Sequence, residues 1–189
     1  MGKILVTGGD GRFAKELKKL KTNLEFKYLS KNQLNILSYD SILKSIRKHK
    51  PKKILHLAGL SRPMDVHQKD ITKSINLNII GTANLVNACS KYKIQIIYFS
   101  TSYVYPGKKG NYKETDSVYP WNNYAWSKLG GEAAVQMYKN SLILRVCMTE
   151  KPFIHNSAYA NVKSNFIYQE DLAKIFLKVI NKKGIYNIG

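Results

Sequence analysis

The sequence predicts an α/β fold with a doubly wound parallel sheet and helices on both faces, formed as one domain over residues 1–189. Short apolar runs alternate along the chain with longer segments of helical periodicity, which is the order expected of βαβ units. The apolar runs are also continuous rather than alternating, as in parallel strands that are buried on both faces. Together the two observations favour a Rossmann-type arrangement.

Five apolar runs are expected to be strands, at residues 3–7, 25–29, 52–58, 94–100 and 141–146. Helices are expected between them, at residues 12–21, 39–49, 69–91 and 122–139. Residues 103–120 carry turn signals without a clear period. Because a long loop is unusual in a compact domain, this stretch is expected to be functional.

The bulk composition fits a globular protein with one hydrophobic core, since 44% of its 189 residues are apolar and 11% are aromatic. No apolar run reaches the length of a membrane span, and "KILVTGG" near the start reads as a strand rather than a signal peptide. Cys89 and Cys147 lie in apolar segments, which favours reduced thiols over a disulfide. We therefore expect a cytoplasmic protein without a membrane partner.

The formal net charge is +19, and the basic residues are spread along the chain. Aromatic residues do not alternate with them as they do on base-stacking surfaces. The charge therefore favours a lysine-rich solvated surface over a specific nucleic-acid site, although a positive field also attracts phosphorylated small molecules. A basic nucleic-acid-binding Rossmann protein stays open as the least favoured interpretation.

A glycine-rich loop, "VTGGDGRFAKEL" (6–17), follows the first expected strand and opens the first helix. Gly8 and Gly11 stand where the chain must turn tightly and where the backbone must approach a pyrophosphate. Ala14 stands where a third glycine is common. This context favours a dinucleotide-binding loop over a glycine-rich turn without a ligand.

The end of the second expected strand should select between the two nicotinamide dinucleotides. It carries Ser30 and Lys31 and no acidic residue that would bind a bare ribose diol. Ser30, Lys31 and Arg12 could instead bind a 2′-phosphate, so NADP(H) is favoured over NAD(H). The alternative is that Lys31 is one more surface lysine.

Two Tyr-x-x-x-Lys pairs are present, and only one lies in a helical context. Tyr105 and Lys109 are separated by a Pro-Gly dipeptide, which breaks any helix. Tyr124 and Lys128 lie in the expected helix 122–139, where residues four apart are neighbours. The second pair is therefore the candidate proton-transfer device, beside a strand end at 98–102 that carries hydroxyl residues.

These segments together resemble the extended short-chain dehydrogenase/reductases, also called the NAD-dependent epimerase/dehydratase family, and within it the dTDP-4-dehydrorhamnose reductase-like proteins. Residues 34–42 are also similar to GDP-fucose synthase. The segments that carry the resemblance are, in order, 6–14, 56–59, 78–82, 99–132 and 165–173. Each is weak alone, but the ordered set is specific.

The resemblance implies four catalytic residues. Tyr124 is the general acid/base, whose phenol has an ordinary pKa of about 10. Lys128, as a cation beside it, favours the phenolate and hydrogen-bonds the nicotinamide ribose. Thr101 donates a hydrogen bond to the reacting oxygen, and Asn78 completes the polar set near the nicotinamide. An alternative for Asn78 is a cap or a cross-link between helices.

The resemblance also implies a cofactor site. Ala58 and Gly59 pass beneath the adenosine, Asn35 and Ile36 contact adenine, and Ser61 lies near the phosphates or the substrate. The full implied cofactor-binding set is Gly8, Gly11, Arg12, Phe13, Ser30, Lys31, Asn35, Ile36, Leu57, Ala58, Gly59, Ser61 and Lys128.

No catalytic metal is expected, because the four histidines, at 49, 56, 67 and 155, lack metal-ligand spacing. His56 is interpreted as a packed strand histidine. Glu114 and Asp116 are interpreted as residues of a solvated loop.

Proteins of this family commonly carry a small C-terminal substrate domain, and residues 147–189 would be its remnant, a reduced substrate subdomain. Many dimerise through the helices that correspond to 69–91 and 122–139. The resemblance implies an NADP(H)-dependent reductase or epimerase of a nucleotide-activated keto sugar. A non-catalytic NAD(P)-binding partner or regulatory subunit is the alternative.

Overall fold

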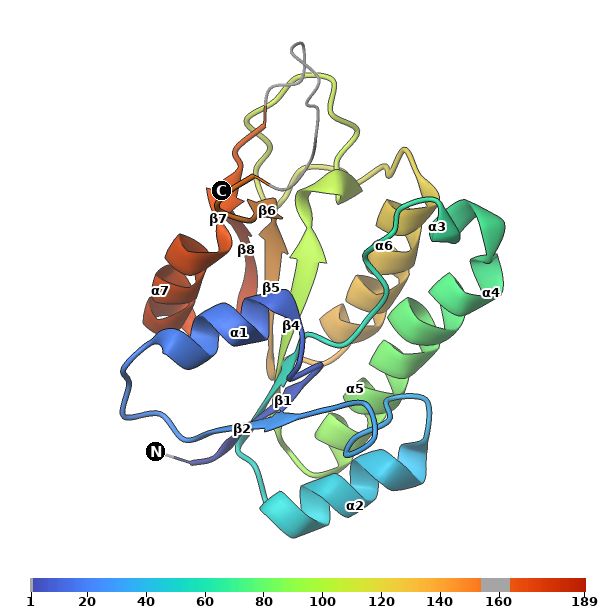
Figure 1. Cartoon of the computed structure of the whole chain (residues 1–189). Coiled ribbons are helices and arrows are strands. Elements are labelled where there is room, and N and C mark those ends of the chain that lie inside the picture. The colour runs from blue at the N-terminus through green and yellow to red at the C-terminus, as the bar shows by residue number, and fades with distance from the viewer. Residues whose placement is uncertain (1, 154–163) are drawn as a thin grey trace.

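The computed structural model describes residues 2–153 and 164–189. Six parallel strands form its central sheet in the order β2-β1-β3-β4-β5-β8 (Figure 1). The strands are β1 (Ile4–Thr7), β2 (Phe26–Leu29), β3 (Lys53–His56), β4 (Gln95–Thr101), β5 (Ser141–Val146) and β8 (Gly184–Ile188). Two further short strands, β6 (Met148–Thr149) and β7 (Ile167–Tyr168), pair with each other beside the main sheet.

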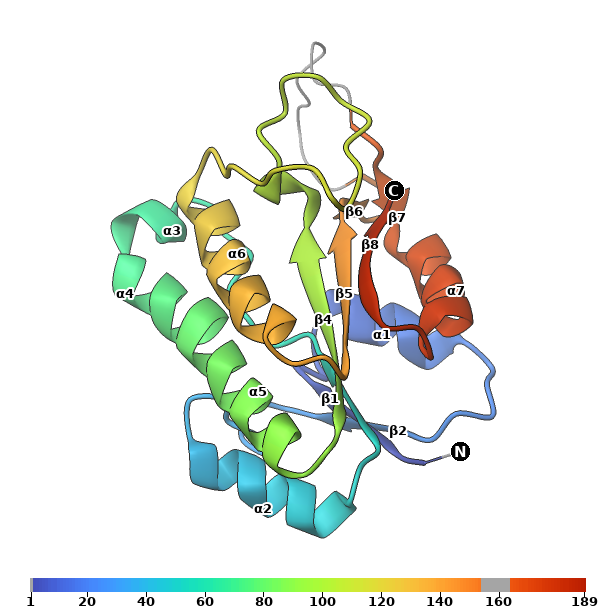
Figure 2. The same cartoon turned by 180° about the vertical axis from the view of Figure 1, so that it is seen from behind.

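Helices cover both faces of the sheet. α1 and α7 lie on one face, and α2, α5 and α6 lie on the other (Figures 1 and 2). The helices are α1 (Arg12–Lys19), α2 (Tyr39–His49), α3 (Val66–Lys69), α4 (Ile71–Ser74), the π-helix η1 (Ile75–Ile80), α5 (Gly81–Lys91), the 3₁₀ turn η2 (Ser102–Val104), α6 (Asn123–Gln136) and α7 (Gln169–Val179). The predicted doubly wound Rossmann-type fold is confirmed.

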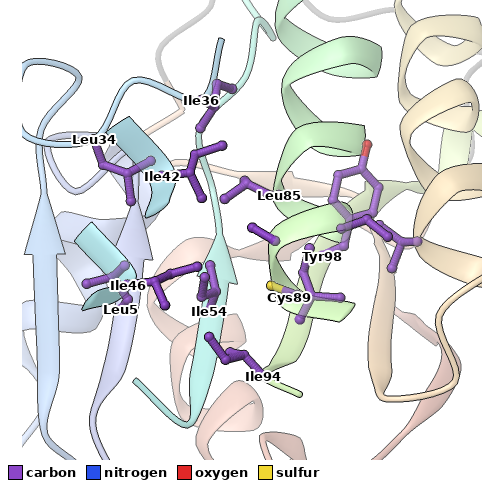
Figure 3. Close-up of a cluster of buried hydrophobic side chains, with 14 of the residues drawn as sticks. Leu5, Leu34, Ile36, Ile42, Ile46, Ile54, Leu85, Cys89, Ile94 and Tyr98 are labelled. Carbon is purple, nitrogen blue, oxygen red and sulfur yellow. The ribbon is translucent and has the colours of Figure 1, made fainter. Parts of the chain in front are cut away.

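Each face of the sheet has its own hydrophobic core. Figure 3 shows the core under α2 and α5, where Leu5, Ile42, Leu85 and Tyr98 are buried together. On the other face the ring of Phe13 packs against Phe99 and Phe176, with ring centroids 4.7 and 6.2 Å apart. Because Phe13 is the second residue of α1, this packing fixes where the helix begins.

The five predicted strands are present to within one or two residues, but β8 was not predicted. Its side chains are only partly buried or exposed, so "GIYNI" lacks the strong apolar pattern of the inner strands. Strand β8 pairs with β5 at the sheet edge, and α7 covers the sheet beside it. The central sheet therefore includes a strand from residues 147–189, and the interpretation of these residues as a reduced substrate subdomain stays a prediction. Within 147–189, residues 154–163, including His155, lie outside the described residues.

The strand order reverses between β1 and β3, so the loops that follow these two strands diverge and leave a crevice at their carboxyl ends. The predicted helix 69–91 is present, but its middle turn is the π-helix η1. Such segments are frequent at functional sites because the extra residue re-aims the side chains around it. Asn78 lies within η1.

Candidate active site

A cavity of about 890 Å³ opens at the carboxyl edge of the sheet. Its walls come from the β1–α1 loop, the segment after β3, the end of β4, the start of α6 and the segment after β5. Ten of the predicted site residues line it: Gly11, Arg12, Phe13, Leu57, Ala58, Gly59, Ser61, Thr101, Tyr124 and Lys128. The other predicted residues, Gly8, Ser30, Lys31, Asn35, Ile36 and Asn78, lie outside its lining.

Tyr124 lies in the first turn of α6. The Asn122 side chain caps this helix by accepting a hydrogen bond from the Ala125 N–H at 2.8 Å, which sets where the helix starts. Burial raises the pKa of Tyr124 to about 12, although a hydrogen bond with the Thr101 side chain acts in the opposite direction. The phenol therefore carries its proton at neutral pH, next to the end of β4.

Lys128 follows Tyr124 by one helical turn. Its Nζ lies 4.1 Å from the centre of the Tyr98 ring, and the Tyr98 hydroxyl donates to the Lys128 carbonyl at 3.0 Å. Burial lowers the pKa of Lys128 to about 7, and the nearby carboxylate of Glu132 partly opposes this shift. The Lys128 side chain therefore interconverts between ammonium and amine near neutral pH, which suits proton transfer.

Asn78 links the segment after β3 to α6. Its Oδ1 accepts from the Leu60 N–H at 2.7 Å, and its Nδ2 donates to the Leu60 carbonyl and to Ser127 Oγ, both at 2.8 Å. Both amide hydrogens are thereby used inside the protein. These contacts agree with the cross-link interpretation, and a catalytic role for Asn78 stays a prediction.

Both ring nitrogens of His56 are hydrogen-bonded inside the core. Thr82 Oγ1 donates to the Asn78 carbonyl, so it accepts from His56 Nε2, which lies 3.0 Å away. His56 Nδ1 then accepts from the Thr7 hydroxyl at 2.9 Å, and Thr7 Oγ1 also accepts from the Ala58 N–H. Burial lowers the pKa of His56 to about 3, which keeps this neutral form. His56 thus fixes the base of the cavity, as expected of a packed strand histidine.

His67, for which the sequence suggested no role, also lines the cavity. Its ring meets that of Tyr124 edge-on at a centroid distance of 5.1 Å. Its Nδ1 lies 2.6 Å from Ser74 Oγ, and Asn123 Nδ2 donates to its carbonyl. His67 therefore helps to fix the position of the Tyr124 ring.

The glycine loop packs tightly against the ends of β2 and β3. Gly8 has φ +64°, and a Cβ there would lie 2.8 Å from the Ala58 backbone nitrogen. A Cβ at Gly9 would lie 2.7 Å from the Leu29 backbone nitrogen. The first turn of α1 carries no acidic residue and its cap, Gly11, makes no side-chain cap bond. The helix start is thus open to an anion, as a dinucleotide-binding loop requires.

We expect Gly8→Ala to lower the free energy of unfolding by about 3 kcal/mol, because it adds a left-handed alanine and a clash with backbone that cannot move aside. Gly107→Ala is the matched control. Gly107 also has a positive φ, +72°, but a Cβ there meets nothing within 4 Å. Urea unfolding should show a loss of about 1 kcal/mol for the control. Equal losses in the two variants would contradict a close approach at Gly8.

The three residues predicted to bind a 2′-phosphate are not joined in the structure. Arg12 Nη1 lies 2.9 Å from Glu150 Oε1, after β6. Ser30 and Lys31 lie in the turn after β2, where the Ser30 N–H bonds to Gln33. The preference for NADP(H) therefore stays a prediction. Arg62 also binds Glu150, and neither residue was predicted, since they are far apart in sequence and neither lies in a motif.

The two residues predicted to contact adenine lie beside the core. Ile36 is buried against α5, where a Cβ at Gly81 would lie 2.6 Å from Ile36 Cδ1 (Figure 3). Asn35 Oδ1 accepts from the Leu37 N–H. Contact with adenine at these positions stays a prediction.

Glu114 lies in the loop, as expected, but it is half-buried and also bonds outside the loop. Its carboxylate accepts from the Asn187 N–H at 2.8 Å, and this bond lowers the pKa of Glu114. Asn187 Oδ1 lies 2.9 Å from the Tyr105 hydroxyl, which accepts from Arg145 Nη1 at 2.6 Å. The loop is thus tied to β5 and β8. Asp116 does bond within the loop, with Lys109 and Lys113.

Behind this loop lies a buried ion pair. Arg145 Nη2 and Glu132 Oε1 are 2.6 Å apart, and the side chains are 3% and 0% exposed. Ser100, the neighbour of Thr101, donates its hydroxyl proton to the same carboxylate. The pair therefore connects β5, α6 and the end of β4 directly beneath the cavity.

The helices of residues 2–153 and 164–189 include none with the length and hydropathy of a transmembrane segment. The same part of the chain contains no group of three or more His, Cys, Asp and Glu that could hold a metal ion.

Comparison with known proteins gives a matching family, similar sequences and solved structures of the same fold. A family profile described as RmlD substrate binding domain matches residues 2–160. The dTDP-4-dehydrorhamnose reductase of Aggregatibacter actinomycetemcomitans is 30% identical over 154 residues, covering 79% of this chain and 52% of that protein. The methionine adenosyltransferase 2 subunit beta of Xenopus laevis is 33% identical over 114 residues, covering 60% of this chain and 34% of that protein.

The chain therefore spans about half the length of the first relative and about a third of the second. Among solved structures, dTDP-4-dehydrorhamnose reductase from Bacillus anthracis in complex with NADP has the same fold, with a TM-score of 0.84 at 21% identity, covering all of this chain and 74% of that one. The family match covers most of the chain, and so the chain belongs to the RmlD substrate binding domain family, within the extended short-chain dehydrogenase/reductases.

Proposed function

We propose that this protein is an NADP(H)-dependent reductase that acts on a nucleotide-activated keto sugar. One observation carries the proposal: Tyr124 lies within hydrogen-bonding reach of Thr101 in the cavity that the glycine loop borders. Tyr124 would donate its proton to the ketone oxygen, and Thr101 would hold that oxygen by a hydrogen bond. An epimerase of the same substrate class would use the same two residues.

The residues at the loop fit a dinucleotide. Gly8, Gly9 and Gly11 bring bare backbone to the carboxyl edge of the sheet, next to the uncapped start of α1. A bound nicotinamide dinucleotide would supply the hydride for the reduction. Lys128 would hold its ribose and return a proton to Tyr124, because the Lys128 pKa of about 7 lets it exchange protons near neutrality. Ser30 and Lys31 support NADP(H) over NAD(H).

Tyr124→Phe is expected to lower kcat by about 1000-fold, because it removes only the hydroxyl that donates the proton. The measurement is NADPH oxidation with a panel of 4-keto nucleotide sugars, alongside the dissociation constant of NADPH, which should change less than about twofold. Tyr119→Phe is the control, since Tyr119 is exposed and packs on Trp126. Wild-type protein that binds NADPH yet turns over no sugar of the panel would rule out the reductase.

A non-catalytic regulatory subunit is the second candidate function. The similarity to a protein named as a subunit of methionine adenosyltransferase favours it. NADPH binding without turnover in the same assay would support this alternative.

The homodimer through helices 69–91 and 122–139 also stays a proposal, which light scattering in solution would test. Ile75 and Ile80 in η1 and Trp126 in α6 are exposed and available to such a contact.

A further inference from the structure

One ion-pair cluster at the cavity has no part in the chemistry proposed above. Arg12 Nη1 lies 2.9 Å from Glu150 Oε1. Arg62 binds both oxygens of the same carboxylate, with Nη1–Oε1 at 3.2 Å and Nη2–Oε2 at 3.3 Å. The three residues come from the start of α1, the segment after β3 and the position directly after β6. Two arginines that both line the cavity thus share one internal anion.

The cluster has the chemistry of an anion site. A guanidinium that meets two oxygens side by side is the geometry by which arginine recognises carboxylates and phosphates. Two cations surround a single negative charge here, so the cluster keeps a net positive charge. A diphosphate carries at least two negative charges and would match the two arginines better than Glu150 does.

The pairing is exchangeable rather than structural. The side chains of Arg12, Arg62 and Glu150 are 43%, 31% and 16% exposed. Water reaches both guanidinium groups, and this screening weakens their pairing relative to that of a fully buried pair. This distinguishes the cluster from Glu132–Arg145, which is buried on both sides. Replacing the Glu150 carboxylate by another anion should therefore cost less free energy than breaking a buried pair.

Each arginine of the cluster lies close to one part of the candidate site. Arg12 is the first residue of α1, whose N–H groups have no side-chain cap and no acidic neighbour in the first turn. Burial raises the pKa values of Tyr124 and Tyr103, and in both the positive charge of Arg62 partly opposes the rise. Arg62 is thus close enough to act on the candidate proton donor, while Arg12 borders the glycine loop.

We propose that Arg12 and Arg62 form a diphosphate-binding site which the Glu150 carboxylate occupies in the unliganded protein, so that a nucleoside diphosphate binds by displacing Glu150. This proposal rests on the proposed function only for the source of the diphosphate, which is either the dinucleotide or the nucleotide sugar. Glu150 then acts as an internal competitor, and it lowers the apparent affinity by the fraction of molecules in which it holds the arginines.

The test is calorimetric binding of inorganic pyrophosphate to the full chain. Glu150→Gln should lower the dissociation constant about fivefold, because it frees both arginines, and Arg62→Gln should raise it about tenfold. Glu16→Gln is the matched control. It removes the same charge from an exposed pair with Lys19 on α1, and its effect should stay below about twofold. Thermal melts of each variant establish that it is folded.

A double variant separates competition from a general charge effect. If Glu150 acts through the arginines, Glu150→Gln should bring less than about a twofold gain in an Arg62→Gln background. A gain from Glu150→Gln no larger than from Glu16→Gln would overturn the proposal, and so would wild-type affinity in folded Arg62→Gln.

Two nucleotides then identify the source of the diphosphate. A gain for ADP assigns the site to the dinucleotide, and a gain for thymidine diphosphate assigns it to the nucleotide sugar. A gain for neither would overturn a nucleoside diphosphate as the ligand. None of these measurements needs hydride transfer. Absence of NADPH oxidation would therefore contradict the proposed function without contradicting this diphosphate site.

Discussion

Glu132→Leu is expected to lower the free energy of unfolding by about 4 kcal/mol, because it leaves the Arg145 guanidinium buried without a counter-charge. In a chain of 189 residues this corresponds to a fall in melting temperature of about 10 °C. Ser100 and Gln136 would lose their acceptor as well, since both donate to the Glu132 carboxylate.

The double variant Glu132→Leu/Arg145→Met is the decisive control. Replacing both charges by apolar groups removes the uncompensated cation, so it should recover more than half of the lost stability. Asp171→Asn breaks an exposed pair with Lys174 on α7 and should cost less than about 1 kcal/mol. Urea unfolding measures all three. A single variant within 1 kcal/mol of wild type would show that the pair is not buried as described.

Lys128→Met is expected to stabilise the fold at neutral and lower pH while it impairs the proposed reaction. Burial lowers the Lys128 pKa from its ordinary value of 10.5 to about 7, so the folded state holds fewer protons than the unfolded state between those two values. Stability of the wild type therefore rises with pH across this window, and the full cost of the buried ammonium is present below pH 7.

The size of the effect follows from that shift. At about 1.4 kcal/mol per pH unit the cost could reach roughly 5 kcal/mol, but the variant also loses the contact of Nζ with the Tyr98 ring. We expect a net gain of about 2 kcal/mol at pH 6, declining as pH rises from 7 toward 10.5.

Thermal unfolding from pH 6 to pH 10 measures this gain. Lys182→Met is the control, since it removes an exposed lysine whose Nζ lies 5.7 Å from the Tyr186 ring centre. A gain that grows with pH would contradict the assigned direction of the shift.

The sequence was most informative where structure depends on neighbours along the chain. The strands, the glycine loop and the helical context of Tyr124 and Lys128 follow from local periodicity and turn residues, and all lie where they were expected. The capping of α6 by Asn122 is equally local. Strand β8 was missed because an edge strand with partly exposed side chains has no strong pattern.

Features that depend on distant partners could not be predicted. Arg62 and Glu150 are 88 positions apart. The chain has many more basic than acidic residues, so the sequence does not show which basic residue pairs with Glu150. Glu114 was expected in solvent because its bond to Asn187 spans 73 positions. The π-helix around Asn78 gives no sign in its composition, since "INLNII" reads as ordinary helix.

The ties of Tyr105 and Glu114 to Asn187 and Arg145 also determine how the loop 103–120 can move. Its base is bonded inside the protein, so motion there would have to break buried contacts. Its tip, from Pro106 to Asn111, is tethered only by exposed contacts of Lys108 and Lys109. The tip can therefore move without breaking buried contacts, while the base of the loop, next to the end of β4, stays bonded to β5 and β8.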